Sequence, residues 1–263
     1  MNKTLFAIAL GSGLILPMAA APTAQASAII QPLGTPEMTA SQFSTLFQPV
    51  DSAPVLTSDY QYLGAPVSGT IRSQVFQGQG AAAGYYAYAY QLGVNNVKTT
   101  LGEPVHTDSM SFQFNATPVA ASFPGMSAPA YAFAIKDGTI GGLIPPVAAP
   151  GEMIGTAAVS WQPGEKIGTI RAQFVNPSSQ TPPLDAGSNS STFVVLSKQA
   201  FTQQFVSLQS SNPTTGTPPT VYSATGGPIA QVPIPEPATV LAWAGMLGAS
   251  LVVRRIRKGR ARA

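Results

Sequence analysis

Cysteine is absent from the 263 residues of the sequence. This absence excludes disulfide bonds, thiol nucleophiles, cysteine-ligated metal sites and an acylated-cysteine lipid anchor. Because 44% of the residues are hydrophobic, a chain of this length can bury a core without covalent cross-links. We therefore expect a stably folded body even if the protein is exported.

Charged residues are also scarce, at 9% of the chain against about 25% in ordinary soluble domains. Seven of the 13 basic residues are Lys3 and a cluster at 254–262, whereas residues 27–237 hold six basic and ten acidic residues and carry a net charge of −4. Nucleic-acid binding needs clustered Lys and Arg against the phosphates. The body lacks such a cluster, so we expect no nucleic-acid partner.

Histidine occurs once, at His106, with Asp108 two residues later. In a strand both side chains would lie on one face, as a Ser-His-Asp triad would require. However, no Gly-x-Ser-x-Gly elbow accompanies them, and one histidine cannot fill the usual zinc ligand set. We therefore expect no catalytic residue and no zinc site here.

The acidic residues of the body are scattered, and their spacing selects no pair of facing carboxylates such as glycosidases use. The acids considered are Asp51, Asp59, Glu103, Asp108, Asp137, Glu152, Glu165 and Asp185. No EF-hand loop is present, although calcium held by loop Asp residues and backbone oxygens remains an alternative.

Residues 78–83 fit G-x-G-x-x-A, but a dinucleotide site would need a helix next, and alternating tyrosines follow instead. We predict a hairpin loop there and expect no cofactor.

The N-terminus has the three parts of a secretory signal peptide. Lys3 supplies the positive charge, residues 5–16 form a short apolar run, and Ala24 and Ala26 flank Gln25 at a small-residue cleavage site. We predict that residues 1–26 form a signal helix. Signal peptidase would remove it before Ser27 after export by the general secretion machinery.

The C-terminus also has three parts: Pro235, Glu236 and Pro237, an uncharged stretch at 238–253, and a basic cluster. As a helix the sixteen uncharged residues would extend about 24 Å, short of the roughly 30 Å bilayer core. Interfacial flanking residues would complete a transmembrane helix, and the positive-inside rule would keep the basic tail cytoplasmic. The stop-transfer cluster consists of Arg254, Arg255, Arg257 and Lys258.

Together, residues 232–263 resemble a PEP-CTERM sorting signal. The resemblance implies a Gram-negative-type envelope, transient anchoring in the inner membrane, and processing by an exosortase-type enzyme at or near Pro235, Glu236 and Pro237. The mature protein would then reach the cell surface or the exopolysaccharide matrix. The alternating prolines favour an extended backbone that such an enzyme can read. A plain tail anchor with a Pro-rich stalk remains the alternative.

Residues 49–209 are expected to form the body, because short segments of period two alternate with Gly, Pro and Asn. This pattern predicts an all-β fold, an antiparallel β-sandwich or jelly roll. We expect Tyr86, Tyr88 and Tyr90 to face the core and Ala87 and Ala89 to face a more open side. The predicted strands lie at 67–77, 86–92, 110–114, 131–135, 157–161, 170–174 and 193–195.

Two short helices are predicted from apolar spacing, one at 39–47 within the N-terminal segment 27–48 and one at 198–209. Residues 210–232 are rich in Pro, Thr, Gly and Ser and predict a flexible stalk. Tyr85 points away from Tyr86 and Tyr88 in the expected strand. It is therefore the candidate for stacking on a sugar ring, although core packing is the commoner role of such a tyrosine.

These observations favour an exported, non-enzymatic cell-surface or matrix protein that associates with exopolysaccharide. The rival hypothesis is a secreted carbohydrate-binding module or adhesin with a defined glycan ligand. A third and weaker hypothesis is a polysaccharide hydrolase.

Overall fold

The computed structural model describes residues 29–62, 64–100, 102–148, 157–164, 167–174, 184–211 and 221–234. The signal peptide, the sorting motif, the predicted transmembrane stretch and the basic cluster lie outside these ranges and remain predictions. Within the described ranges, no helix has the length and apolarity needed to cross a bilayer.

One sheet has seven strands, all joined by antiparallel pairing. The strand β13 pairs with three other strands: its first half pairs with β15 and its second half with β7 and β14. In order across the sheet the strands are β1 (Gln31–Leu33), β9 (Ala158–Gln162), β10 (Gly168–Gln173), β7 (Ser109–Phe114), β13 (Phe201–Ser211) and β14 (Val221–Ser223), with β15 (Ile229–Pro233) beside β13.

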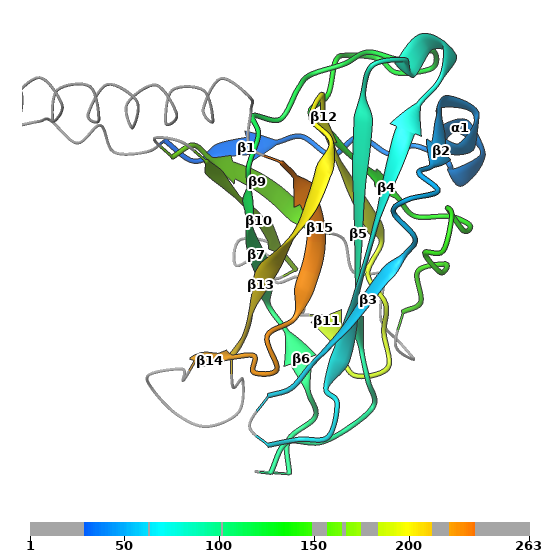
Figure 1. The fold of residues 1–263 in the computed structure, drawn as a ribbon. Coiled ribbons are helices and arrows are strands. Elements are labelled where there is room, and N and C mark those ends of the chain that lie inside the picture. Colours follow the sequence, from blue (N-terminus) through cyan, green and yellow to red (C-terminus); the bar gives the residue numbers. More distant parts are fainter. Residues whose placement is uncertain are drawn as a thin grey trace, which may run out of the picture.

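The other large sheet has six antiparallel strands, and a small two-stranded sheet lies beside the two. Figure 1 shows the seven-stranded sheet on one side of the molecule and the six-stranded sheet on the other. The six strands are β2 (Phe47–Pro49), β4 (Gly69–Gly78), β5 (Tyr86–Val94), β12 (Thr192–Ser197) and β8 (Ala132–Ile135), with β3 (Leu56–Tyr60) also on β4. The small sheet pairs β6 (His106–Thr107) with β11 (Leu184–Asp185).

The two large sheets share one hydrophobic core, which confirms the all-β, antiparallel prediction. Aromatic rings meet across the layers: Tyr88 lies 5.5 Å from Phe114 and Tyr90 lies 4.6 Å from Phe112, centroid to centroid. The hydroxyls of both tyrosines have partners, since Tyr88 donates to the carbonyl oxygen of Gln199 at 2.7 Å and Tyr90 donates to that of Gln231 at 2.8 Å. A buried tyrosine normally needs such a partner, and here it also ties β5 to β15.

A second core covers the outer face of the six-stranded sheet, where the sequence predicts an open side. Ala87 and Ala89 are both fully buried, so that prediction is wrong, although Tyr88 and Tyr90 are buried as expected. The short alanine side chains leave room for the rings of Phe43 and other residues of the same cluster. The covering layer comes from α1 (Ala40–Leu46), visible beside β4 in Figure 1, and from residues around 121–123 and 140–143.

Of the two predicted helices, only the first exists. It is α1, whose N-cap Thr39 makes a capping box with Gln42, a strong local start signal. The prediction at 198–209 is wrong, because this segment is β13. Its burial alternates with period two through Val206 and Leu208, and neighbouring strands satisfy its backbone, which outweighs a weak helical spacing.

The predicted stalk at 210–232 is also wrong in the part that the structure describes. The Pro- and Ser-rich composition indicates loop, yet Val221–Ser223 and Ile229–Pro233 are strands. Ala230 and Val232 are fully buried in the core between the sheets, so the body extends beyond its predicted end at residue 209. The hairpin prediction at 78–83 is confirmed: this loop contains the 3-10 turn η1 (Gly80–Ala82) and joins the paired strands β4 and β5.

Candidate functional site

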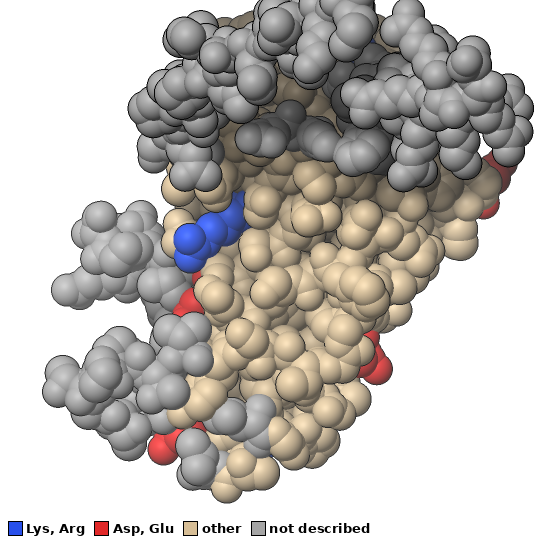
Figure 2. Space-filling model, turned by 60° about the vertical axis from the view of Figure 1, so that its left-hand side comes forward, with Lys and Arg blue, Asp and Glu red and all other residues tan. Residues whose placement is uncertain are grey.

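The outer face of the seven-stranded sheet is open and almost uncharged. Figure 2 shows this side of the molecule, with few Lys, Arg, Asp or Glu side chains among the described residues. The pleat that points Phe112, Ile170 and Leu208 into the core points their neighbours outward. The outward residues of β7, β9, β10 and β13 are Ser111, Gln113, Ala158, Ser160, Gln162, Thr169, Arg171, Gln173, Gln203, Phe205, Ser207 and Gln209.

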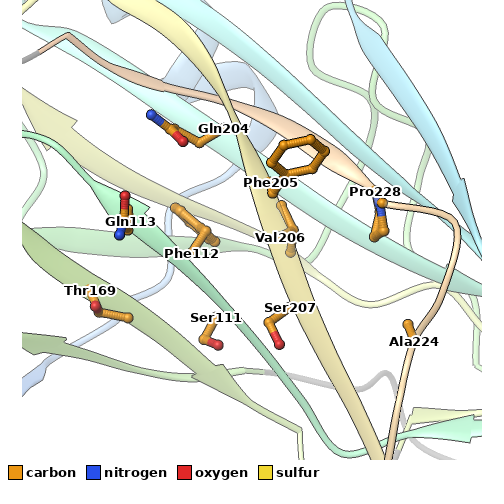
Figure 3. A pocket seen from close by; sticks show the side chains of 11 residues that line it. Ser111, Phe112, Gln113, Thr169, Gln204, Phe205, Val206, Ser207, Ala224 and Pro228 are labelled. Carbon is orange, nitrogen blue, oxygen red and sulfur yellow. The ribbon is translucent and has the colours of Figure 1, made fainter.

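A groove of about 470 Å³ crosses this face where β13 meets the turn between β14 and β15. Its floor is built from cross-strand pairs, since Ser111 lies opposite Ser207 and Gln113 lies opposite Thr169. Directly opposed side chains in an antiparallel sheet are about 5 Å apart. Figure 3 shows these hydroxyl and amide groups on the sheet and Phe205 beside them. The volume lies in the range of ligand-binding clefts.

Phe205 is the aromatic side chain most open to solvent in the described ranges, with 73% of its surface exposed. It lies on the outward side of β13, one residue before the buried Val206. Gly227 has a φ of +61° and would bring a Cβ atom to 3.4 Å from the Phe205 ring. The glycine therefore gives the turn its left-handed backbone and leaves space beside the ring.

The turn that borders the groove is held by hydrogen bonds to two other segments, β13 and the end of β3. The backbone amide of Thr225 donates to Gln61 at 2.9 Å, and Gln61 donates back to Thr225 at 3.2 Å. The amide of Val206 donates to Pro228 at 2.8 Å, and the amide of Ile229 donates to the hydroxyl of Ser58 at 3.1 Å. The groove wall is thus joined to β13 and to the six-stranded sheet, so it is formed in advance of any ligand.

None of the residues that line the groove is titratable. The lining therefore offers no general acid, general base or charged clamp. It offers hydroxyl and amide groups, which both donate and accept hydrogen bonds, together with one exposed aromatic ring, that of Phe205. This combination suits an uncharged ligand that carries hydroxyl groups and has an apolar face.

The His106 and Asp108 side chains come together as their spacing predicts, with Nε2 and Oδ1 3.8 Å apart. Their surroundings are a buried polar cluster, in which the hydroxyls of Tyr60 and Tyr62 lie 3.2 and 3.4 Å from Thr107 Oγ1. Burial raises the pKa of both tyrosines well above the ordinary range, and the Thr107 hydrogen bonds lower it by less. His106 Nε2 has no hydrogen-bond partner in the described structure, so no triad geometry is present there.

Tyr85 is half-buried rather than open. Its ring lies edge-on to Phe123, with centroids 6.0 Å apart, and Lys198 Nζ lies 5.6 Å from its centroid. Both contacts belong to the second core region, on the opposite layer from the groove. Its role as a glycan-stacking residue therefore remains a prediction, with part of its ring already in contact with protein.

Sequence reasoning missed Phe205 because it placed this residue on the apolar side of a predicted helix. The polar alternation of Gln203, Ser207 and Gln209 around it was the available signal for an outward strand face. Pairing between β7 and β13, nearly a hundred residues apart, was not readable from the sequence.

The acidic residues that the structure describes do not form a cluster for a metal ion. In the described ranges no group of three or more His, Asp or Glu side chains is placed to hold a metal ion. The fold and the groove thus define an antiparallel all-β protein with one open sheet face that is almost uncharged in the described residues. Comparisons with protein-family models, with curated proteins and with solved structures found no match.

Proposed function

We propose that this chain is an exported, non-enzymatic surface or matrix protein that is sorted through a PEP-CTERM tail. The observation that carries the proposal is the ordered C-terminal set of Pro235, Glu236 and Pro237, the uncharged stretch 238–253 and the basic cluster from Arg254. The signal peptide at 1–26 supports it, since such a tail acts only on a chain that enters the secretion pathway.

The body fits a role outside the cytoplasm. Its two facing sheets form a β-sandwich with extensive aromatic packing, which provides stability without disulfides. The lining of the groove beside Phe205 carries no titratable group, in keeping with a contact role rather than hydrolysis. Exopolysaccharide is the partner we propose for the mature protein.

A carbohydrate-binding module or adhesin is the second candidate, and the groove beside Phe205 favours it. The two functions share the export route and differ in whether the body has a defined glycan ligand. A polysaccharide hydrolase is less well supported, because the described acids do not form a facing pair in this groove.

Processing is tested by cell fractionation combined with mass spectrometry of both ends of the protein. We expect an N-terminus at Ser27 and a C-terminus near Pro237 on the surface-exposed form. Replacing Glu236 with alanine should trap the full-length chain in the inner membrane if the carboxylate is recognised. A surface-exposed protein that retains residues 260–263 would contradict processing and leave the plain tail anchor.

A further inference from the structure

We propose that the groove beside Phe205 is a binding site for a neutral polysaccharide chain. This inference rests on the proposed function, because it names the site and the ligand class through which the body would hold exopolysaccharide. It is carried by the chemistry of the groove, its shape and the charge of the surrounding face.

The polar groups on the groove floor match the hydroxyl groups of a sugar. Sugar hydroxyls both donate and accept hydrogen bonds, and the groove floor presents groups that do the same: the hydroxyls of Ser111, Ser207 and Thr169 and the amide of Gln113. These side chains are exposed or partly exposed, so water can satisfy their polar groups while the site is empty.

The exposed aromatic ring of Phe205 matches the apolar face of a sugar. The axial C–H groups of a hexose form an apolar face, and an exposed ring offers a matching flat surface. Phe205 is 73% exposed and lies against the turn at Gly227. Because this turn is fixed by its bonds to Gln61 and Ser58, the wall beside the ring is preorganised, which lowers the entropic cost of binding.

The lack of charged residues in the groove lining favours a neutral ligand. No lining residue is charged, and Arg171 alone is charged among the twelve outward residues described above for β7, β9, β10 and β13. An anionic polymer such as a polyuronate would need several cationic partners. The occupant is therefore a neutral glycan.

The chain offers a matched pair of variants for the test. Gln113 and Gln162 are both outward glutamines, and each lies opposite Thr169 from a different neighbouring strand. Gln113 lines the groove and Gln162 does not. A contact with ligand in the groove would distinguish Gln113→Ala from Gln162→Ala, whereas a general effect on the sheet would not.

The experiment is affinity electrophoresis of the full-length protein in detergent, with gels that contain a soluble β-1,3-glucan, a β-1,4-glucan, an α-1,6-glucan, a mannan or a polyuronate. We expect retardation by at least one neutral glycan. Phe205→Ala should weaken it about tenfold, equivalent to about 1.4 kcal/mol, and Phe205→Trp should retain it. Gln113→Ala should weaken it several-fold, and Gln162→Ala should leave it unchanged.

Three results of the glycan measurements would overturn the inference. They are no retardation by any neutral glycan, stronger retardation by the polyuronate, or equal effects of Gln113→Ala and Gln162→Ala. Self-association that disappears in Phe205→Ala would also overturn it and assign the groove to a second copy of the chain. Glycan binding and terminal processing are measured separately. A correctly trimmed, surface-exposed protein that binds no neutral glycan would therefore refute the proposed glycan site and leave the proposed sorting unaffected.

Discussion

The two large sheets have the same alternating sequence pattern but different surroundings. The six-stranded sheet is covered on both faces, by the shared core on one side and by α1 and its neighbouring loops on the other. The seven-stranded sheet is covered on one face and presents Ser, Thr and Gln side chains on the other. The difference shows that one layer supplies most of the framework, while the other is free to meet a ligand.

The contrast is clearest between β5 and β13. Ala87 and Ala89 on β5 are small and fully buried, whereas Phe205 on β13 is large and exposed. Side-chain hydrophobicity alone would assign these positions the other way round. Covering elements that arrive from distant parts of the chain decide which positions are buried.

The largest expected effect comes from ionising the tyrosines between the sheets. Burial raises the pKa of Tyr60, Tyr62, Tyr88 and Tyr90 above the ordinary value of about 10. The folded state therefore keeps these protons after the unfolded state has lost them, so the stability present below pH 10 is lost as the pH rises above it. An unfolded tyrosine is already half ionised at pH 10, so each of the four groups should contribute about 1 kcal/mol between pH 10 and 11, and we expect a total loss of about 4 kcal/mol.

Urea unfolding measured at several alkaline pH values, with tyrosinate absorbance as a second probe, checks this prediction. Tyr60→Phe removes one of the four groups and should therefore reduce the slope of the unfolding free energy against pH by about a quarter. Ionisation of all tyrosines before unfolding would show that the shared core is open to solvent.

A charge on the covered outer face of the six-stranded sheet should be nearly as damaging. Ala89→Asp places an unpaired carboxylate in the second core and should cost about 3 kcal/mol or more. Ser160→Asp, on the outward side of β9, should change stability by less than about 0.5 kcal/mol. Equilibrium denaturation of both variants is the measurement, and a mild Ala89→Asp variant would contradict the two-sided covering.

Shortening a side chain on β15 should have an intermediate effect. Val232 is fully buried, so Val232→Ala should lower the free energy of unfolding by about 2 kcal/mol through lost packing. Ser223→Ala, at an exposed position of β14, is the matched control. Thermal unfolding of the two variants separates a core strand from a flexible stalk, since a stalk would tolerate both changes equally.

The smallest expected effect is on the open face. Phe205→Ala should alter stability by less than about 0.5 kcal/mol, because an exposed ring contributes little to the core. A loss of more than about 2 kcal/mol in thermal or urea unfolding would show that Phe205 is a structural residue. In that case the open face would be part of the framework after all.

Local signals explain which expectations held. The apolar spacing at 39–47 predicts α1 correctly, and the Gly-rich interruption at 78–83 predicts the β4–β5 hairpin. Both features form within a few residues of chain. By contrast, the groove depends on β7, β10, β13 and the turn at 224–228 meeting on one surface, so none of its residues could be grouped in advance.

The sequence by itself determined the all-β class, because period-two alternation separated by Gly and Pro leaves few other regular structures. It also predicted the export and sorting signals, which are read from short linear stretches and need no partner segment. Only the tertiary structure decided that β5 is buried on both faces, that 229–233 closes the core and that Phe205 faces outward. Alternation tells which residues share a face of a strand, but burial of that face depends on what packs against it, and those contacts come from residues far away in the chain.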